Sequence, residues 1–377
     1  MKNSIYFNGF NGVRLIAVMA VLVHHVEQIK RIYKFPNMYS FPLVRELGGL
    51  GVTLFFVLSG FLITYLLIAE KDLIKTIDVK KFYIRRILRI WPLYYFMVII
   101  SFLLLHFLLP VPGIEKIQES YGGILMCFVF MMPNISLIYF PVVPFVAPLW
   151  SVGVEEQFYL IWPVLLKYFK SILLLLLGVI GTMFVMRYGL FKLSLNTDST
   201  IPSNLYIFFK YFRIDCMAIG GLFAYLLFSR KELCEKYLFN NLTQVLSFLF
   251  LILTVYYLHE SVYFSQYISI LFGVILLNIG ANKKSLINLT GSLFYEGGKI
   301  SFGLYVYHSF ICYLVIANLS RFVEVQNTLM FNLVLYNTVI ALTGLVSWLS
   351  YNYMEKKFLS FKIKYTVVTS GENAKKE

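Results

Sequence analysis

A succession of long apolar segments is the sequence feature that most constrains how this chain can fold. Helical segments of about 20 apolar residues match the roughly 30 Å hydrocarbon core of a bilayer, whereas the strands of a membrane barrel alternate apolar and polar residues. The segments in this chain are continuous, so we predict an all-α, polytopic membrane protein. The ten predicted spans are 12–29, 50–69, 88–109, 152–168, 171–188, 206–228, 243–258, 265–280, 300–319 and 331–352.

The composition agrees with a membrane location. Hydrophobic residues make up 59% of the chain and charged residues 14%, whereas charged residues are about a quarter of an average soluble domain. The first apolar run lacks a signal-peptide cleavage pattern, so we expect it to be a retained span. A shorter apolar piece, 121–133, has the length of a re-entrant or interfacial segment. We therefore expect one membrane domain at 1–360, followed by a basic and polar cytoplasmic tail at 361–377.

Lysine and arginine indicate the orientation. With ten spans, and with Arg14 left out because it lies inside a span, 22 of these residues fall on one side and ten on the other. The positive-inside rule then places both termini in the cytoplasm. This topology accounts for the net charge of +14. We therefore expect membrane lipids, and no nucleic acid, as partners of the basic surface.

The first predicted span carries Arg14, His24 and His25 within an apolar helix. Ionisable groups at membrane depth are costly, so they are candidates for function. Arg14 and His25 are about three helical turns or 16 Å apart, and their side chains point within about 20° of each other. His24 points about 80° away from this stripe. For either histidine, the alternative is a buried imidazole that bonds to a nearby backbone carbonyl.

Arg86 and Arg89 lie at the start of the third span and share one helix face. Guanidinium groups suit phosphate, so a phosphate-rich ligand between Arg14 and this pair is one hypothesis. A basic collar on anionic lipid headgroups is the alternative. In the second span, Ser59 and Gly60 either allow close helix packing or clear space for an extended substrate.

Glu155 and Glu156 lie near the outer start of the fourth span. The two carboxylates diverge by about 100° on a helix, so only one of them can address a given partner. One of them could meet His25, because a carboxylate on one imidazole nitrogen makes the other nitrogen a better base. The alternative is a helix start with Ser151 as the N-cap and the glutamates in the first turn.

Taken together, these motifs resemble the acyltransferase 3 family of bacterial integral-membrane acyltransferases, over residues 5 to about 355. The residues that carry the resemblance are Arg14 and His25, Arg86 and Arg89 with Ile90-Trp91-Pro92, Trp150-Ser151 to Tyr159, Arg213-Ile214-Asp215 with Gly220-Gly221, and Ser301 to His308. Arg213 and Asp215 lie two residues apart and do not face each other on a helix. Each is therefore expected to pair with another span.

The resemblance implies transfer of an acyl group, commonly acetyl, from cytoplasmic acyl-CoA to a hydroxyl of an extracytoplasmic carbohydrate or lipid-linked glycan at a bacterial cell membrane. We expect a central tunnel for acyl-CoA and acceptor. The expected catalytic residues are His25, Glu155 and Glu156, the expected acyl-CoA-binding residues are Arg14, Arg86, Arg89, Ser59 and Gly60, and the expected acceptor-binding residues are Trp150, Ser151, Tyr159, Tyr305 and His308. Acyl-CoA is a substrate, so no permanently bound cofactor is expected. No metal is expected either, because the four cysteines lack a metal-ligand spacing.

Two mechanisms are consistent with these residues. His25 either takes the proton from an acceptor hydroxyl as it attacks the thioester or carries the acyl group as an acyl-histidine. The alternative function is a proton-coupled transporter of a small anionic or sugar-like solute, although the sequence lacks the internal repeat common in such transporters. We expect no soluble domain after the last predicted span, and we expect the outer loops to recognise the acceptor.

Overall fold

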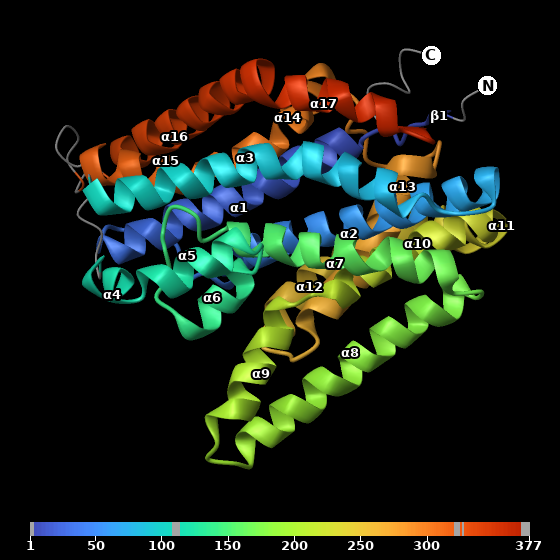
Figure 1. Cartoon of the computed structure of the whole chain (residues 1–377), viewed down its shortest axis with the longest axis horizontal. Helices are drawn as coiled ribbons and strands as arrows, with labels where there is room; N and C mark the ends of the chain where they lie inside the picture. Colours follow the sequence, from blue (N-terminus) through green and yellow to red (C-terminus); the bar gives the residue numbers. More distant parts are fainter. Residues whose placement is uncertain (1–3, 108–113, 320–324, 326–327, 371–377) are drawn as a thin grey trace.

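The computed structural model is a bundle of long helices (Figure 1), and it describes residues 4–107, 114–319, 325 and 328–370. The longer helices are α1 (Phe10–Ile32), α2 (Pro42–Ile74), α3 (Val79–Phe107), α7 (Leu149–Tyr168), α8 (Ile172–Leu195), α9 (Thr200–Tyr211), α10 (Ile214–Ser229), α12 (Asn241–Tyr257), α13 (Phe264–Ala281), α15 (Ser301–Leu319) and α16 (Thr328–Ser350). The shorter elements are α4 (Ile114–Glu119), α5 (Tyr121–Val129), α6 (Pro133–Tyr139), α11 (Lys231–Leu233), η1 (Cys234–Leu238), α14 (Ser292–Lys299), η2 (Tyr351–Glu355), α17 (Lys356–Lys362) and η3 (Ile363–Tyr365), with the strands β1 (Ser4–Ile5) and β2 (Thr369–Ser370).

Eight helical segments of the described chain are long and apolar enough to cross a membrane. A ninth crossing results if α11 and η1 form one span with α12, from which they are bent by 75°. The remaining predicted span corresponds to α7, which is 20 residues long but is interrupted by the polar run 155–157. The predicted count of ten is therefore reached only if α7 and the bent pair both cross. Residues 108 and 109, at the end of the predicted third span, lie outside the described residues.

The first and last described elements, β1 and β2, lie side by side at one end of the bundle, which we call the terminal face (Figure 1). Strand β1 pairs in parallel with β2. Other segments meet at the same face: Nζ of Lys71 donates to the carbonyl of Leu166, and Nη1 of Arg85 donates to the carbonyl of Tyr365, both at 2.7 Å. This arrangement requires an even number of crossings, and the cytoplasmic placement of both termini stays a prediction.

The short helices α4, α5 and α6 lie together at the opposite end of the bundle (Figure 1). Helix α5 has nine residues and α6 has seven, so the apolar piece 121–133 is too short to cross. Hydroxyl groups of α3 hold this segment, since Tyr94 and Tyr95 donate to the carbonyls of Phe128 and Val129, each at 2.9 Å. Proline limits the helices here, because Pro133 begins α6. The predicted interfacial segment is therefore confirmed as a non-crossing one.

Helix α2 packs backbone to backbone against α10. A Cβ added to Gly60 would lie 1.9 Å from the carbonyl oxygen of Met217, and one added to Gly220 would lie 2.0 Å from that of Val57. Only glycine allows such an approach, which supports the packing interpretation. Gly60 faces α10 and leaves no space beside it for a substrate. Its assignment to the acyl-CoA site was therefore wrong.

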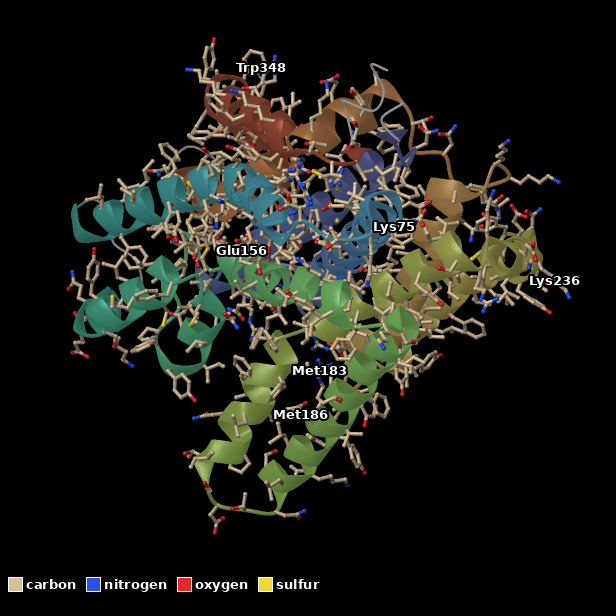
Figure 2. All side chains as sticks on the ribbon, turned by 45° about the vertical axis from the view of Figure 1, so that its right-hand side comes forward. Lys75, Glu156, Met183, Met186, Lys236 and Trp348 are labelled. Carbon is tan, nitrogen blue, oxygen red and sulfur yellow. The ribbon has the colours of Figure 1, made fainter. Side chains whose placement is uncertain are left out.

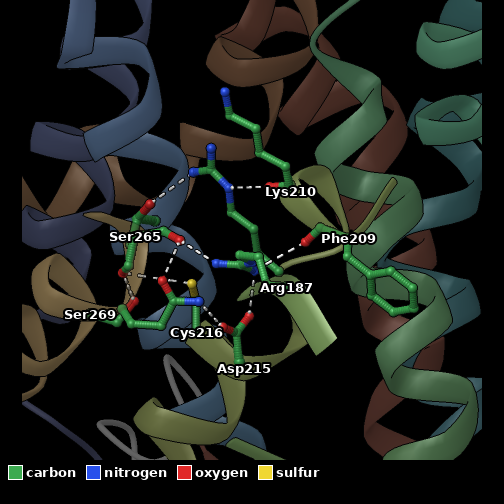
Figure 3. Close-up of polar contacts among 10 residues, drawn as sticks. Arg187, Phe209, Lys210, Asp215, Cys216, Ser265 and Ser269 are labelled. Carbon is green, nitrogen blue, oxygen red and sulfur yellow. Dashed lines mark hydrogen bonds and ion pairs between the residues drawn. The ribbon is translucent and has the colours of Figure 1, made fainter. Parts of the chain in front are cut away.

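A buried polar network holds the hairpin of α8 and α9, which projects from the bundle (Figures 1 and 3). Nη2 of Arg187 in α8 pairs with Oδ1 of Asp215 in α10 at 3.3 Å, and Nη1 donates to Oγ of Ser265 in α13 at 3.0 Å. Arg213 donates to Oγ1 of Thr53 in α2 at 3.1 Å. Buried charges inside a membrane protein need such partners. The prediction that Arg213 and Asp215 pair with different spans is confirmed.

Replacing Gly60 by alanine is expected to lower the free energy of unfolding by about 1–3 kcal/mol, because the added methyl group overlaps the α10 backbone. Gly178→Ala in α8 is the matched control, since a Cβ added there meets no atom within 4 Å. Thermal unfolding of the full chain in detergent measures both variants. Equal transition temperatures for the two variants would contradict the close α2–α10 contact.

Candidate active site

Three arginines from two helices lie together near the terminal face, and we call them the arginine cluster: Arg14, Arg86 and Arg89. Helices α1 and α3 both begin at this face, so a residue about one turn into α1 and residues two to three turns into α3 lie at similar depths. Arg14 interacts electrostatically with both of the other arginines. Its Nη1 also donates to Oδ1 of Asn11 at 2.8 Å. The structure thus brings together the three cations that the sequence assigned to one phosphate site.

Two aromatic rings lie against Arg86, and two carboxylates, those of Glu155 and Glu156, interact with it electrostatically. Its guanidinium lies 5.4 Å from the ring centroid of Phe82 and 5.3 Å from that of Tyr159, distances at which cation–π attraction operates. The Tyr159 hydroxyl donates to Oε2 of Glu155 at 2.8 Å and lies 2.5 Å from Oγ of Ser59. Tyr159 therefore lies beside the arginine cluster, and its assignment to the acceptor stays a prediction.

Glu155 and Glu156 of α7 point in different directions. Glu155 faces the arginine cluster and interacts electrostatically with Arg14, Arg86 and Arg89. Oε2 of Glu156 accepts from Nε1 of Trp91 in α3 at 2.9 Å, and Figure 2 shows Glu156 inside the bundle. Helix α7 begins at Leu149 and has no acidic residue in its first turn. The alternative of first-turn glutamates with Ser151 as the N-cap is therefore wrong.

Two histidines from α1 and α15 face each other in the interior. The ring centroids of His25 and His308 are 4.9 Å apart, and Nδ1 of His25 lies 3.1 Å from Nε2 of His308. Nδ1 of His25 also lies 2.9 Å from the carbonyl oxygen of Val21, and Nδ1 of His308 lies 2.6 Å from that of Tyr305. His308 is fully buried. Only these two histidines bring two imidazole rings into hydrogen-bond contact among the described residues.

The contacts of the histidine pair determine which ring nitrogens carry hydrogen. A carbonyl oxygen only accepts, so Nδ1 carries the hydrogen in both rings. Nε2 of His308 is then unprotonated and accepts a hydrogen bond from Nδ1–H of His25. The carbonyl oxygen of Val21 accepts from the same Nδ1–H group. Nε2 of His25 has no hydrogen-bond partner in the described part of the chain. The pair therefore presents one free basic nitrogen, held in a fixed orientation.

The predicted contact between a glutamate and His25 is not formed. Glu155 bonds to Tyr159 and Glu156 to Trp91, whereas the partner of His25 is His308. Both glutamates lie in the second turn of α7, and this turn is closer to the arginine cluster than the start of α7 is. Their depth in the bundle therefore places them near the arginines and not near His25. His24, by contrast, matches the alternative of a buried imidazole beside a backbone carbonyl, since its Nδ1 lies 3.4 Å from the carbonyl of Val44.

Two of the predicted acceptor residues are used inside the protein. The hydroxyl of Tyr305 lies 2.6 Å from Oγ of Ser151 and donates to the carbonyl of Pro148 at 2.9 Å. Both side chains are buried, so they fasten the start of α7 to α15 and are not free to contact a sugar. Trp150 is half-buried and packs against Tyr211 and Arg213. It stays a candidate for the acceptor side.

A small, partly open cavity of about 40 Å³ lies beside the arginine cluster at the terminal face. Its lining residues are Ile63, Leu66, Leu67 and Glu70 of α2, Phe82, Arg85 and Arg86 of α3, and Lys362, Thr366 and Val368 of the C-terminal segment. His25 is not among them, and the hydrogen-bonded pair of Ser59 and Tyr159 lies deeper than Arg86. A tunnel that joins both ends of the bundle stays a prediction.

Sequence reasoning missed Lys362. The expected boundary between bundle and tail, at residue 360, falls inside α17, and η3 and β2 continue along the terminal face to Ser370. Residues 371–377 lie outside the described part of the chain. Nothing in a basic C-terminal stretch distinguishes a site residue from a solvent-exposed lysine, so no sequence signal was available.

Comparison with known proteins agrees with this geometry. The profile described as an acyltransferase domain, Acyl_transf_3, matches residues 7–351. The chain belongs to the acyltransferase 3 family. This acyltransferase 3 match includes the arginine cluster and the histidine pair, and it ends before Lys362.

Three similar proteins carry names that refer to peptidoglycan or to O-acetyl transfer. The peptidoglycan O-acetyltransferase OatA of Listeria monocytogenes is 34% identical over 189 residues, which are 47% of this chain and 27% of that protein. The putative peptidoglycan O-acetyltransferase YrhL of Bacillus subtilis is 28% identical and the O-acetyltransferase OatA of Staphylococcus aureus 25% identical, each over 93% of this chain. The chain spans 54% and 57% of these two acyltransferase 3 relatives. No solved structure matches the chain.

Glu155→Gln is expected to destabilise the protein more than Glu156→Gln does. Glu155 interacts electrostatically with all three arginines, whereas Glu156 interacts with Arg86 alone. No ion pair within 4.0 Å joins Glu155 to them among the described residues, so the expected loss is below the roughly 3–5 kcal/mol typical of a broken buried ion pair. Glu156→Gln keeps an oxygen that can accept from Trp91, so it is the matched control. Thermal unfolding at constant lipid composition compares the two. A larger loss of stability in Glu156→Gln would contradict the assignment of Glu155 as the counter-charge.

Proposed function

We propose that this protein is a membrane O-acyltransferase that moves an acetyl group from acyl-CoA to a hydroxyl of an extracytoplasmic cell-wall glycan. The terminal face would lie in the cytoplasm of a bacterial cell and the histidine pair toward the outer half of the cell membrane. Membership of the acyltransferase 3 family supports acyl transfer over the alternative of proton-coupled transport. The names of the relatives support peptidoglycan as the acceptor class.

The observation that carries this proposal is the free Nε2 of His25, since a base must have an available lone pair. His308 and Val21 hold the opposite ring nitrogen, so the ring cannot turn without losing two contacts. General bases of this kind typically contribute 10²- to 10⁴-fold to a rate. A side chain held only for packing would not need a second histidine as its partner.

The arginine cluster supplies the donor half of the proposal. Coenzyme A carries several phosphate groups at one end of a long pantetheine arm. Arg14, Arg86 and Arg89 suit those phosphates, because guanidinium forks bind phosphate oxygens. The eleven residues from Arg14 to His25 span about 16 Å of helix, a distance that the extended arm can cover. Because Ser59 and Tyr159 are hydrogen-bonded between these levels, the donor would have to displace that contact on entry.

In the proposed reaction, His25 takes up one proton and later releases it. As the acceptor oxygen attacks the thioester carbonyl, its proton moves to Nε2 of His25. The carbon–sulfur bond then breaks, and the leaving thiolate of CoA takes the proton from the imidazolium, which restores the neutral ring. Holding both reactants in a water-poor interior removes much of the entropic cost of the encounter. An acyl-histidine intermediate would use the same nitrogen as a nucleophile.

His25→Ala is expected to lower acetyl transfer by at least about 100-fold, because the general base is lost. His24→Ala is the matched control, since His24 is the adjacent residue and, among the described residues, hydrogen-bonds to neither His25 nor His308. The assay follows release of CoA from acetyl-CoA and acetylation of soluble peptidoglycan fragments by the purified full chain in lipid nanodiscs. Unchanged CoA release in His25→Ala, or no thioester turnover by the wild type, would contradict the proposed function.

His308→Ala is expected to lower kcat about tenfold, which equals about 1.4 kcal/mol of transition-state stabilisation, while KM for acetyl-CoA stays the same. The reason is that His308 orients the base without contacting the donor. His308→Gln keeps a side-chain oxygen that can accept from His25 and should recover part of the lost kcat. If both variants change KM and leave kcat intact, His308 is a substrate contact and does not position His25.

A further inference from the structure

The C-terminal segment 356–370, which we call the C-terminal strap, returns across the terminal face and is fastened at two places. Nη1 of Arg85 in α3 donates to the carbonyl of Tyr365 at 2.7 Å. Strand β2 of the strap pairs in parallel with β1, so Thr369 lies opposite Ser4. The strap is therefore part of the folded domain and has a defined position beside the arginine cluster.

The strap forms one wall of the cavity at the terminal face. It contributes Lys362, Thr366 and Val368, while α2 and α3 contribute the remaining lining. The cavity thus has apolar walls from Leu66, Leu67 and Val368 and cationic groups where α3 and the strap meet. Such a combination suits a ligand that is both apolar and anionic.

The charges around Lys362 are mostly of one sign. Lys362 interacts electrostatically with Arg14, Arg85, Arg86 and Arg89. Of these five cations, only Arg85 has an ion pair within 4.0 Å in the described part of the chain, with Glu70 at 3.2 Å. Like charges repel one another, and Glu155, Glu156 and Glu355 offset only part of this repulsion, because none of them forms an ion pair within 4.0 Å with these cations in the described part of the chain. The site is therefore organised for a ligand with several negative charges.

An unpartnered donor points to the same conclusion. Nε of Arg86 is buried and has no hydrogen-bond partner among the described residues. A buried donor left in this state costs about 1–3 kcal/mol. Arg86 lines the same cavity as Lys362. A phosphate oxygen in the cavity would satisfy this donor and reduce the repulsion between the two cations.

We propose that Lys362 binds a phosphate of the acyl donor, so that the C-terminal strap completes the donor site. The inference rests on the proposed function, because it takes coenzyme A as the donor. Lysine binds phosphate as a point charge. The cavity of about 40 Å³ has room for a phosphate group, and the remainder of the coenzyme would lie outside it. Lys362 lies beyond the segment 7–351 that the family profile covers, so neither the profile nor the resemblance assigns it a role.

The test compares Lys362→Met with Lys364→Met in the purified full chain, in nanodiscs of zwitterionic lipid. Lys364 lies two residues further along the same strap, is exposed and does not line the cavity. Calorimetric binding of CoA and the KM for acetyl-CoA are measured for both. Lys362→Met is expected to weaken CoA binding and raise KM roughly 10- to 100-fold, the range for a hydrogen bond to a charged group. Lys364→Met should bind as the wild type does, and Lys362→Arg should retain most of the affinity.

A donor without phosphate separates charge recognition from packing. With acetyl-pantetheine, KM should be equal in the wild type and in Lys362→Met, because no phosphate is present to lose its partner. If Lys362→Met does not fold, Lys362→Gln gives the same comparison with a polar side chain. Equal CoA affinity in wild type and in the neutral variant would overturn the role of Lys362 while acetyl transfer by the wild type continues.

Anionic lipid is the other source of the same phosphate chemistry. Repeating the measurements in nanodiscs that contain phosphatidylglycerol should leave the loss of CoA affinity in Lys362→Met unchanged. If Lys362→Met lowers phosphatidylglycerol binding but not CoA binding, the site is a lipid site and the inference is wrong. Absence of both CoA binding and thioester turnover in the wild type would instead reject the proposed function itself.

Discussion

The contact of α2 with its neighbours determines where the polar groups of this protein lie. Backbone approach at Gly60 and Gly220 joins α2 to α10, and Gly51 meets the carbonyl oxygen of Ala17 in α1 in the same way. With α2 held this closely, Ser59 reaches Tyr159 of α7, and the ring of Phe55 packs against Tyr305 of α15. The helices that carry the arginine cluster and the histidine pair are therefore arranged around one tightly packed helix.

The polar groups are separated by depth, and their chemistry differs accordingly. Near the terminal face, cations outnumber their direct ion pairs, which favours an anionic ligand. About 16 Å further along α1, two imidazoles and a carbonyl form a hydrogen-bonded chain that leaves one basic nitrogen free. The proposed transfer between two compartments would need both kinds of environment, with charge recognition at one end and proton transfer at the other. Helix α1 connects them, because Arg14 and His25 lie on one stripe.

Individual residues show how far sequence reasoning reached. The spans followed from the length and continuity of apolar runs, and α7 was the difficult case because three polar residues interrupt it. The arginine cluster was predictable because three cations near helix starts must lie at similar depths. The partner of His25 was not, since a carboxylate and an imidazole are both plausible partners for a histidine. Gly60 was assigned to a substrate although it packs α2 against α10. In a sequence, a glycine that allows close helix packing cannot be distinguished from one that makes room for a substrate.

The sequence by itself determined the all-α membrane fold, the stripe that carries Arg14 and His25, and the family. Each of these depends on the residues of a single segment or on the order of several motifs along the chain. Only the tertiary structure decided that His308, 283 residues away, holds His25, that Glu155 faces the arginine cluster, and that Lys362 joins it. The physical reason is that hydrogen bonds and electrostatic interactions between distant residues depend on how helices pack, and close packing depends on contacts that no single segment contains.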